Sequence, residues 1–368
     1  MVLRCLHIDQ KSNTNRTRRF FDRFIQILQI LALGIGISFT VMLVTSCTPR
    51  SSGPTELPVD PPIQPSPTLQ HPTLTTVTNT PDNSVLVLAY YYIWFDPQSW
   101  NRAKTDYPLL GRYSSDDPDV MRQHIQWAKD AGIDGFIVSW KSTDKLNRRL
   151  DQLVKIAAEE HFKLAIIYEG LNFTRNPLLP SQVDADLNYF IEHYGNNSVF
   201  HLFQKPLVIW SGTWEYSVDE IKSVTQSRRN DILILASEKN VEGYQRLSNF
   251  VDGDAYYWSS VNPDNHPSYL DKLTTMADAV HNHGGIWIAP AAPGFDARLV
   301  GGTSVVERKA GETLKTELNT ALQSMPDAIG LISWNEFSEN SHIEPSQDHG
   351  DLYLRVLAET DLVLPVDK

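Results

Sequence analysis

The chain has 368 residues, of which 41% are hydrophobic and 21% charged, and its formal net charge is −12. It is long enough to bury a sizeable core, and its acidic balance argues against a nucleic-acid partner, which would need a basic face. Both cysteines, Cys5 and Cys47, precede the globular part, so neither a disulfide framework nor a cysteine–zinc site can be built within it.

Residues 1–47 have the pattern of a signal or membrane-anchor segment. Arginines between positions 16 and 23 precede a mostly apolar stretch over residues 24–48, which is long enough to enter a bilayer. Residues 44–47 read Val-Thr-Ser-Cys and resemble a bacterial lipobox, which predicts lipidation of Cys47. An uncleaved anchor and an ordinary cleaved signal are the alternatives. All three predict export, with the body of the protein outside the cytoplasm, and the first two tether it to the membrane of the cell envelope.

Residues 48–83 are rich in proline, threonine and serine. A segment of this composition cannot pack a core and behaves as a semi-extended spacer. We therefore expect a linker that holds one catalytic domain, residues 84–368, away from the membrane.

From residue 84 onward, short apolar runs alternate with helical patterns. Continuous hydrophobicity marks strands that are covered on both faces, as in parallel sheets. Eight such units predict a single (β/α)₈ barrel, the TIM barrel; a doubly wound open sheet is the alternative, but its Gly-rich phosphate turn is missing. The predicted strands cover residues 85–94, 135–140, 163–169, 207–210, 232–237, 254–258, 285–290 and 328–334.

Amphipathic stretches between these runs predict the covering helices. Apolar residues recur at helical spacing over residues 119–131, 146–161, 270–283 and 306–325. Ser217 and Asp144 are expected to be N-caps, because short polar side chains satisfy the free N–H groups of a first helical turn.

Aromatic and carboxylate side chains recur where the predicted strands end. In a barrel these ends converge on one mouth, where catalytic groups sit. Rings stack on the C–H faces of sugars while polar groups bind the hydroxyls, so the pattern indicates a carbohydrate site; core packing is the alternative for each ring taken singly. The residues that carry this pattern include Tyr91, Tyr92, Trp94, Trp140, Glu169, Tyr257 and Glu336.

The stretch that follows the last predicted strand is the most informative. Residues 334–339 read Trp-Asn-Glu-Phe-Ser-Glu, and residues 343–345 read Ile-Glu-Pro. With Gly-Arg-Tyr-Ser-Ser at 111–115, Ala-Gly-Ile-Asp-Gly at 131–135 and Pro-Gly-Phe-Asp at 293–296, they resemble the signature of glycoside hydrolase family 99, the endo-α-mannosidases and endo-α-mannanases. A more distant likeness links this ending to the family 71 α-1,3-glucanases.

The sequence departs from the family 99 pattern at three places. Ser338 stands where the family usually has histidine, and Asn-Ser-His at 340–342 replaces a Gly-Thr-Gln type of turn. Residues 92–95 lack the proline of the usual Tyr-Pro-Trp-Tyr. Both glutamates of the motif remain, but the sugar specificity is left open.

The resemblance implies catalytic roles for Glu336 and Glu339. The alternative is that both residues belong to a solvated turn with no catalytic role. Glu339 would protonate the leaving group and then activate water. Glu336 would act as base toward the sugar 2-hydroxyl, which attacks C1 to give a 1,2-anhydro intermediate and retains configuration. Besides the residues at the strand ends, the substrate-binding set would include Asn335, His342 and Arg298, although Arg298 could equally pair with Asp296.

No metal or other cofactor is expected. His342, Asp348 and His349 lie close in sequence, but their spacing matches no standard ligand motif.

The sequence thus predicts an exported, membrane-tethered glycoside hydrolase. Its substrate would be an α-linked glycan or polysaccharide such as α-mannan, cleaved at internal bonds. One alternative is an inverting α-1,3-glucanase-like hydrolase, which would need carboxyl groups about 6.5–9.5 Å apart. The other is a surface lipoprotein that binds glycans or serves polysaccharide biosynthesis without hydrolysis.

Overall fold

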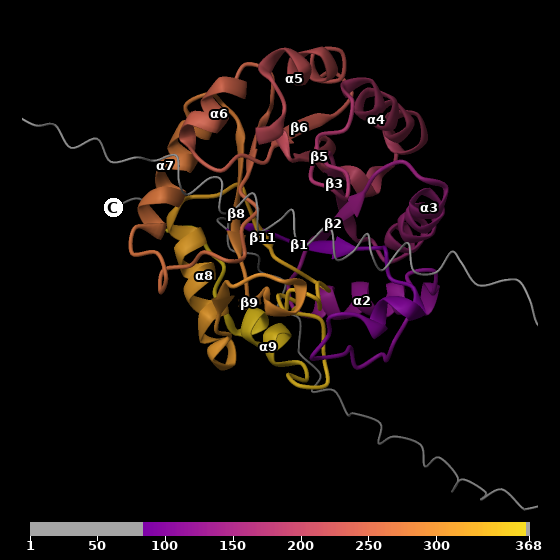
Figure 1. The fold of residues 1–368 in the computed structure, drawn as a ribbon, viewed down its shortest axis with the longest axis vertical. Helices are drawn as coiled ribbons and strands as arrows, with labels where there is room; N and C mark the ends of the chain where they lie inside the picture. The colour runs from indigo at the N-terminus through magenta and orange to yellow at the C-terminus, as the bar shows by residue number, and fades with distance from the viewer. Residues whose placement is uncertain (1–83, 366–368) are drawn as a thin grey trace, which may run out of the picture.

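The computed structural model describes residues 84–365, which form a ring of helices around a central barrel (Figure 1). The barrel strands are β1 Leu86–Tyr92, β2 Gly135–Trp140, β3 Lys163–Glu169, β5 Lys205–Ser211, β6 Leu233–Ala236, β7 Gly253–Ala255, β8 Ile286–Ala291 and β11 Ala328–Leu331. Neighbouring strands are parallel, in the order β3-β2-β1-β11-β8-β7-β6-β5, and pairing of β3 with β5 closes the sheet. The predicted (β/α)₈ barrel is confirmed.

Helices cover the outside of the barrel in chain order (Figure 1). They are α2 Pro118–Asp130, α3 Asp144–Glu159, α4 Pro180–Tyr194, α5 Val218–Thr225, α6 Val241–Leu247, α7 Tyr269–His281, α8 Glu312–Gln323 and α9 Leu352–Glu359. The short elements between them are the strands β4 His201–Phe203, β9 Phe295–Asp296 and β10 Val305–Val306, and the 3₁₀ helices η1 Pro97–Asn101, η2 Ser198–Phe200, η3 Thr213–Glu215, η4 Arg298–Val300 and η5 Lys309–Gly311.

Local chemistry explains where the helices begin. Ser217 caps α5 as predicted, and Glu220 completes the capping box. At α3 the prediction is one residue late, because the Thr143 side chain, not that of Asp144, accepts the N–H of the first turn. The helix expected from residue 306 begins at Glu312, because β10 pairs with β9 in an antiparallel hairpin.

Alternation along the strands divides the apolar residues between two cores. On β1, Leu88 and Tyr90 lie inside the barrel, whereas Val87 and Tyr91 pack in the layer between the barrel and the helices. Gly330 of β11 leaves room for the Tyr90 ring, since a Cβ atom there would lie 2.9 Å from it. The strands are thus apolar on both faces, as their sequences predict.

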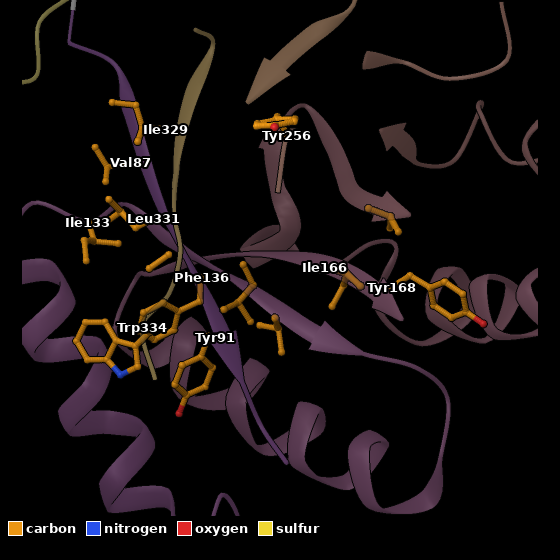
Figure 2. Packing of buried hydrophobic residues seen from close by; sticks show 14 of the residues in the cluster. Val87, Tyr91, Ile133, Phe136, Ile166, Tyr168, Tyr256, Ile329, Leu331 and Trp334 are labelled. Carbon is orange, nitrogen blue, oxygen red and sulfur yellow. The ribbon is translucent and has the colours of Figure 1, made fainter. Parts of the chain in front are cut away.

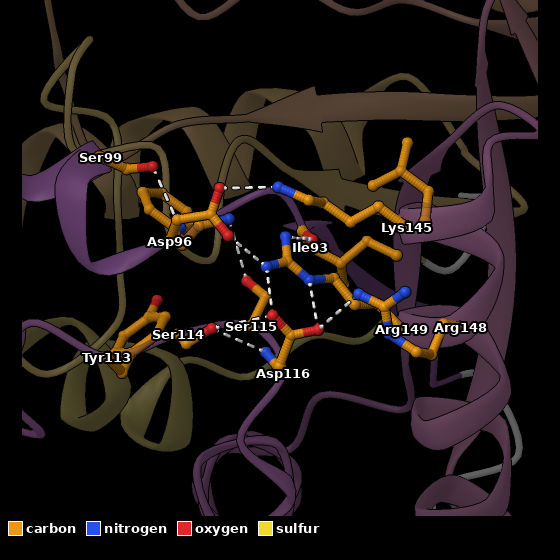
Figure 3. A network of polar contacts seen from close by, with 12 residues as sticks. Ile93, Asp96, Ser99, Tyr113, Ser114, Ser115, Asp116, Lys145, Arg148 and Arg149 are labelled. Atoms are coloured by element: carbon orange, nitrogen blue, oxygen red, sulfur yellow. Dashed lines mark hydrogen bonds and ion pairs between the residues drawn. The ribbon is translucent and has the colours of Figure 1, made fainter.

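A buried arginine fixes the segment that follows β1 (Figure 3). Arg149, on α3, donates to the Ile93 carbonyl oxygen at 2.9 Å and, through one terminal nitrogen, to Asp96 and Asp116 at 2.6 Å each. Lys145, one turn earlier, donates to the other Asp96 oxygen at 2.9 Å. Because Asp96 precedes η1 and Asp116 lies two residues before α2, the network ties both ends of the intervening loop to α3.

The export signal, the lipobox with Cys47 and the linker lie outside the described residues. Between residues 84 and 365, no helix has the length and apolar character needed to cross a membrane.

Candidate active site

The inward-pointing side chains at the carboxyl ends of the strands form the base of the candidate site. Tyr92, Glu169 and Tyr257 continue the inward rows of β1, β3 and β7, where the preceding inward residues belong to the barrel core. Three residues from well-separated parts of the sequence therefore meet at the mouth, where barrel enzymes place their catalytic groups.

Glu336 and Glu339 lie on the loop 332–346 after β11, which we call the catalytic loop because it carries both glutamates of the motif. Hydrogen bonds within the loop fix its shape: Ser333 Oγ accepts from the Glu336 N–H at 2.8 Å, and Glu336 Oε1 accepts from the Ser338 N–H at 3.0 Å. From the β9 segment, the Asp296 N–H donates to the Glu339 carbonyl oxygen at 2.8 Å. Glu336 is buried and Glu339 is half-buried, so the loop is not a solvated turn.

The two carboxyl groups share an environment that disfavours two negative charges. Burial, followed by the charge of Glu336, raises the pKa of Glu339 to about 7. Burial also raises the pKa of Glu336, against the opposing effect of Lys104 and of hydrogen bonds from Ser338. A carboxyl group with a pKa near 7 holds a proton that it can donate at neutral pH, which a general acid requires.

A third carboxyl group, that of Glu169, completes the acidic mouth. Burial raises its pKa, while the hydroxyl of Ser139 on β2 donates to its Oε1 at 2.7 Å. The cations Arg175 and Lys141 oppose that rise, and Arg175 also acts on Glu339. The positive charge of Arg175 therefore opposes the rise in pKa at two of the three carboxyl groups, those of Glu169 and Glu339.

Aromatic rings border the carboxyl groups. The hydroxyls of Tyr92 and Tyr257 are in hydrogen-bond contact, and both rings experience the charges of Glu336 and Glu339. Trp94 stacks on Tyr92 with 4.3 Å between ring centroids, and 41% of Trp94 is exposed. An exposed indole beside buried carboxyl groups offers a platform for the apolar face of a sugar.

Asn335 has a different place from the one predicted. It is fully buried, its Oδ1 accepts from the Tyr92 N–H at 2.9 Å, and its Nδ2 donates to the Tyr92 carbonyl oxygen at 3.0 Å and to the Tyr113 hydroxyl at 3.2 Å. Both polar atoms of its amide are thus hydrogen-bonded to Tyr92 of β1, and the nitrogen also to Tyr113. Asn335 holds the catalytic loop against the first strand and does not itself face a sugar.

His342 is likewise part of the scaffold and not a sugar ligand. It is fully buried, its ring stacks on Phe337, and its Nε2 lies 3.0 Å from Asp106 Oδ2. Arg308 Nη2 lies 3.2 Å from His342 Nδ1 and also donates to the carbonyl oxygens of His342 and Asn340, at 2.9 and 3.0 Å. Burial, followed by the charge of Arg308, lowers the pKa of His342 to about 3, so the ring is neutral at neutral pH, with the Nε2 proton donated to Asp106.

His342 also belongs to a cluster of side chains that could be considered as metal ligands. Ligand atoms of Asp106, His342 and His349 all lie within 4.8 Å of one another. Both ring nitrogens of His342 already have protein partners, however, and the adjacent Arg308 disfavours a second cation. We therefore assign this cluster the structural role of clamping the loop 332–346.

Tyr91 and Trp140 point away from the mouth, so their predicted contacts with substrate are wrong. Tyr91 is buried beside Phe136 and Trp334 in the layer under the helices, as Figure 2 shows, and its hydroxyl bonds to His124 at 3.1 Å. Trp140 is fully buried and donates to Asn147 of α3 at 3.0 Å. Each of the two residues directly follows an inward-pointing residue of its strand. Because side chains alternate along a strand, it therefore points to the outer face.

Arg298 forms the ion pair that was the alternative to a substrate contact. Its guanidinium lies 2.6 Å from Asp296 Oδ2. With Asn340 and His349 it lines a cavity of about 250 Å³ beside the β9–β10 hairpin.

Several residues at the site carry no signal in the sequence. Lys104 and Asp106 belong to an irregular loop, Arg175 lies in the loop between β3 and α4, and Arg308 precedes a helix. Alternation along β2 would have identified Ser139 as an inward residue. Its register partner on β3 is Ile167, and the Glu169 carboxyl group that accepts its hydroxyl lies two residues further along that strand. The remaining contacts depend on loop paths, which hydrophobic patterning does not encode.

Taken together, the mouth can place one protonated and one ionised carboxyl group beside an exposed aromatic ring. Paired carboxyl groups of this kind can transfer protons to and from a glycosidic centre.

Comparison with known proteins identifies the family of the chain. Residues 96–350 match the sequence profile of glycosyl hydrolase family 99. The chain is 23% identical over 274 residues to glycoprotein endo-alpha-1,2-mannosidase from Rattus norvegicus, and 23% identical over 278 residues to the human glycoprotein endo-alpha-1,2-mannosidase-like protein. These alignments cover 67% and 68% of this chain but only 59% and 60% of the relatives, so the chain spans about three-fifths of their length.

Solved structures support the fold. The GH99 endo-alpha-mannosidase from Bacteroides thetaiotaomicron, in complex with bis-tris-propane, superposes with a TM-score of 0.67 at 22% identity, covering 76% of this chain and 96% of that one. The motif at 334–345, the barrel that presents it and a family profile that spans well over half of the sequence lead to one conclusion. The chain belongs to glycosyl hydrolase family 99.

Proposed function

We propose that the protein hydrolyses α-linked glycans, with α-mannan as the preferred class of substrate and internal bonds as the site of attack. The observation that carries this proposal is the pair Glu336 and Glu339, set on one loop at the barrel mouth with the pKa of Glu339 raised to about 7. Family membership supports the reaction type. The names of the mannosidase relatives favour mannose over glucose.

In the proposed first step, Glu339 donates its proton to the glycosidic oxygen as the C1–O bond breaks. Glu336 removes the proton of the sugar 2-hydroxyl, and that oxygen forms a new bond to C1, giving a 1,2-anhydro sugar. The charge of the pair is conserved, because one carboxyl group loses a proton and the other gains one. This exchange suits two groups that cannot both be ionised at low cost.

In the second step the roles reverse. Glu339, now a carboxylate, takes a proton from water, whose oxygen attacks C1 and opens the three-membered ring. Glu336 returns its proton to the 2-oxygen. Two displacements at C1 retain the α configuration, and the Trp94 ring would hold the sugar through its C–H face.

The test is hydrolysis by the full-length protein on a panel of α-mannans and α-glucans, with Glu339→Gln as the matched control. The products are followed by proton NMR from the earliest time point. Turnover with a retained α-anomer, lost in the control, supports the proposal. An inverted anomer would move the protein to the α-1,3-glucanase-like alternative, and binding without turnover by the folded protein would favour a glycan-binding or biosynthetic role.

We further infer that the domain works outside the cytoplasm, tethered to the membrane. The inference rests on the arginines, the apolar stretch and the Val-Thr-Ser-Cys sequence of residues 1–47. Metabolic labelling with a fatty-acid analogue should mark the wild-type protein and not Cys47→Ser. Labelling of neither protein, with both recovered in the membrane fraction, would favour an uncleaved anchor; recovery of both as cytoplasmic proteins would contradict export.

A further inference from the structure

We propose that Lys104 is a positioning residue of the active site, which acts through its contact with Ser338 and through its charge to hold Glu336 in its carboxylate form. The inference deepens the proposed function, on which the role of Glu336 as base rests. Lys104 lies on the loop between η1 and α2, more than 200 residues from Ser338 in sequence, so no sequence pattern links the two.

Geometry gives the first support. Lys104 Nζ donates to Ser338 Oγ and, at 3.0 Å, to the Arg102 carbonyl oxygen. The Ser338 N–H donates to Glu336 Oε1 at 3.0 Å. The ammonium group thus contacts the residue whose N–H binds the Glu336 carboxyl group. Two acceptors, Ser338 Oγ and the Arg102 carbonyl oxygen, fix its position. An ordinary surface lysine, by contrast, keeps its rotamer freedom.

The surroundings of Lys104 fix its position further. Its Nζ lies 6.0 Å from the centroid of the buried Trp100 ring, and the residue is only partly accessible. The preceding residue, Ala103, has a φ of 43°, in the left-handed region that a residue with a Cβ atom adopts at a cost. The chain therefore turns sharply just before Lys104, and the hydrogen bond to Ser338 places the side chain against the catalytic loop.

The charges that face Glu336 give the second support. Glu339 on the same loop and Glu169 at the end of β3 are negative when ionised, and the hydroxyls of Tyr92 and Tyr257 face it from β1 and the loop after β7. Lys104 is the cation whose charge opposes the effect of burial on Glu336. Arg175 acts on Glu339 and Glu169 instead.

The sign of the effect follows directly. A base must be ionised, and a nearby positive charge favours the ionised form of a carboxyl group. Without Lys104, burial and the neighbouring acids would shift the first proton of the pair onto Glu336. The wrong carboxyl group would then be protonated, and the enzyme would lose its base at pH values where the wild type still works.

The experiment compares the full-length protein with Lys104→Met, Lys104→Arg and Lys315→Met. Lys315 forms an ion pair with Glu312 on α8, so its replacement removes the same unit of charge away from the site. Protonation of Glu336 is followed by pH-difference infrared spectroscopy, in which the protonated carboxyl band is assigned by its absence in Glu336→Gln. The pH profile of kcat/KM is measured on the best substrate of the glycan panel.

In Lys104→Met we expect the Glu336 band to appear at higher pH and the acidic limb of kcat/KM to move the same way. At pH values below the acidic limb, kcat/KM should fall about tenfold for each pH unit by which the limb moves. Lys104→Arg should restore much of the wild-type profile, and Lys315→Met should leave both measurements unchanged.

An unchanged Glu336 band in a folded Lys104→Met protein would overturn the proposal, whether or not hydrolysis occurs. The infrared measurement needs no substrate, so it separates this inference from the proposed function. A shifted band in a protein that hydrolyses none of the glycans would support the role of Lys104 and contradict the proposed activity.

Discussion

Glu339 owes its chemistry to its neighbours. An isolated glutamate would be ionised at neutral pH, whereas burial and the adjacent Glu336 raise its pKa to about 7. The identity of the residue sets what it can do, and its position among three carboxyl groups sets the pH at which it does so.

This environment predicts the alkaline limb of the pH profile. A general acid must be protonated, so kcat/KM should fall as the pH rises through about 7, the pKa of Glu339. In Glu339→Gln that limb should vanish, with a loss of about 10²- to 10⁴-fold on unactivated glycans. Aryl glycosides, whose leaving groups need little protonation, should lose less in the first step. Equal losses on both substrate classes would argue against Glu339 as the acid.

Neighbouring tyrosines on β1 provide a second prediction at this scale. Tyr91→Phe removes a buried hydrogen bond to His124 and should cost about 1 kcal/mol of unfolding free energy with little change in KM. Tyr92→Phe removes the hydroxyl that contacts Tyr257 at the mouth and should change kcat/KM instead. Chemical denaturation and steady-state kinetics on both variants measure the contrast, which the reverse outcome would contradict.

At the scale of elements, the catalytic loop is held from three sides. Asn335 joins it to β1, Asp296 to the β9 segment, and Arg308 to the start of α8 through two carbonyl oxygens and the His342 ring. The loop has little regular structure of its own, so these contacts keep its glutamates in place.

Arg308→Lys tests this clamp. Lysine cannot reproduce the fork of donors that a guanidinium presents, so we expect a lower kcat because the glutamates are held less firmly. The alkaline limb should stay near pH 7, since Arg308 does not act on Glu339. A displaced limb with unchanged kcat would show that Arg308 works through charge and not through position.

The loop after β1 is likewise held by contacts with another element, here the hydrogen bonds of Arg149 on α3. Its hydrogen bonds lower the pKa of Asp116 to about 2. Arg149→Met should cost about 2–3 kcal/mol, since Arg149 is fully buried while the carboxylates are about one-third to two-fifths exposed and partly screened. The folded pKa lies below the unfolded value of about 3.9, so the contribution is complete above that pH and is lost as the pH falls toward 2.

Urea unfolding of the two proteins between pH 7 and pH 3 measures that difference. A gap in unfolding free energy that is constant over this range would contradict the electrostatic origin of the effect.

For the whole molecule, the sequence predicted the barrel because most strands are apolar on both faces and amphipathic helical stretches lie between them. It predicted the glutamates because a distinctive motif follows the last strand. It misplaced Tyr91 and Trp140, since a run of aromatic residues does not reveal which of them points inward until the register of the strand is known. It could not reveal Lys104, Asp106 or Arg308, because loop paths depend on contacts between distant segments.

Two side chains of the catalytic loop are joined to one short segment that precedes α2. Ser338 contacts Lys104, and His342 contacts Asp106. Because residues in contact couple energetically, substitutions at Ser338 and Lys104, or at His342 and Asp106, should show strong epistasis. A graft that replaces the catalytic loop with that of a relative should therefore replace residues 104–106 as well.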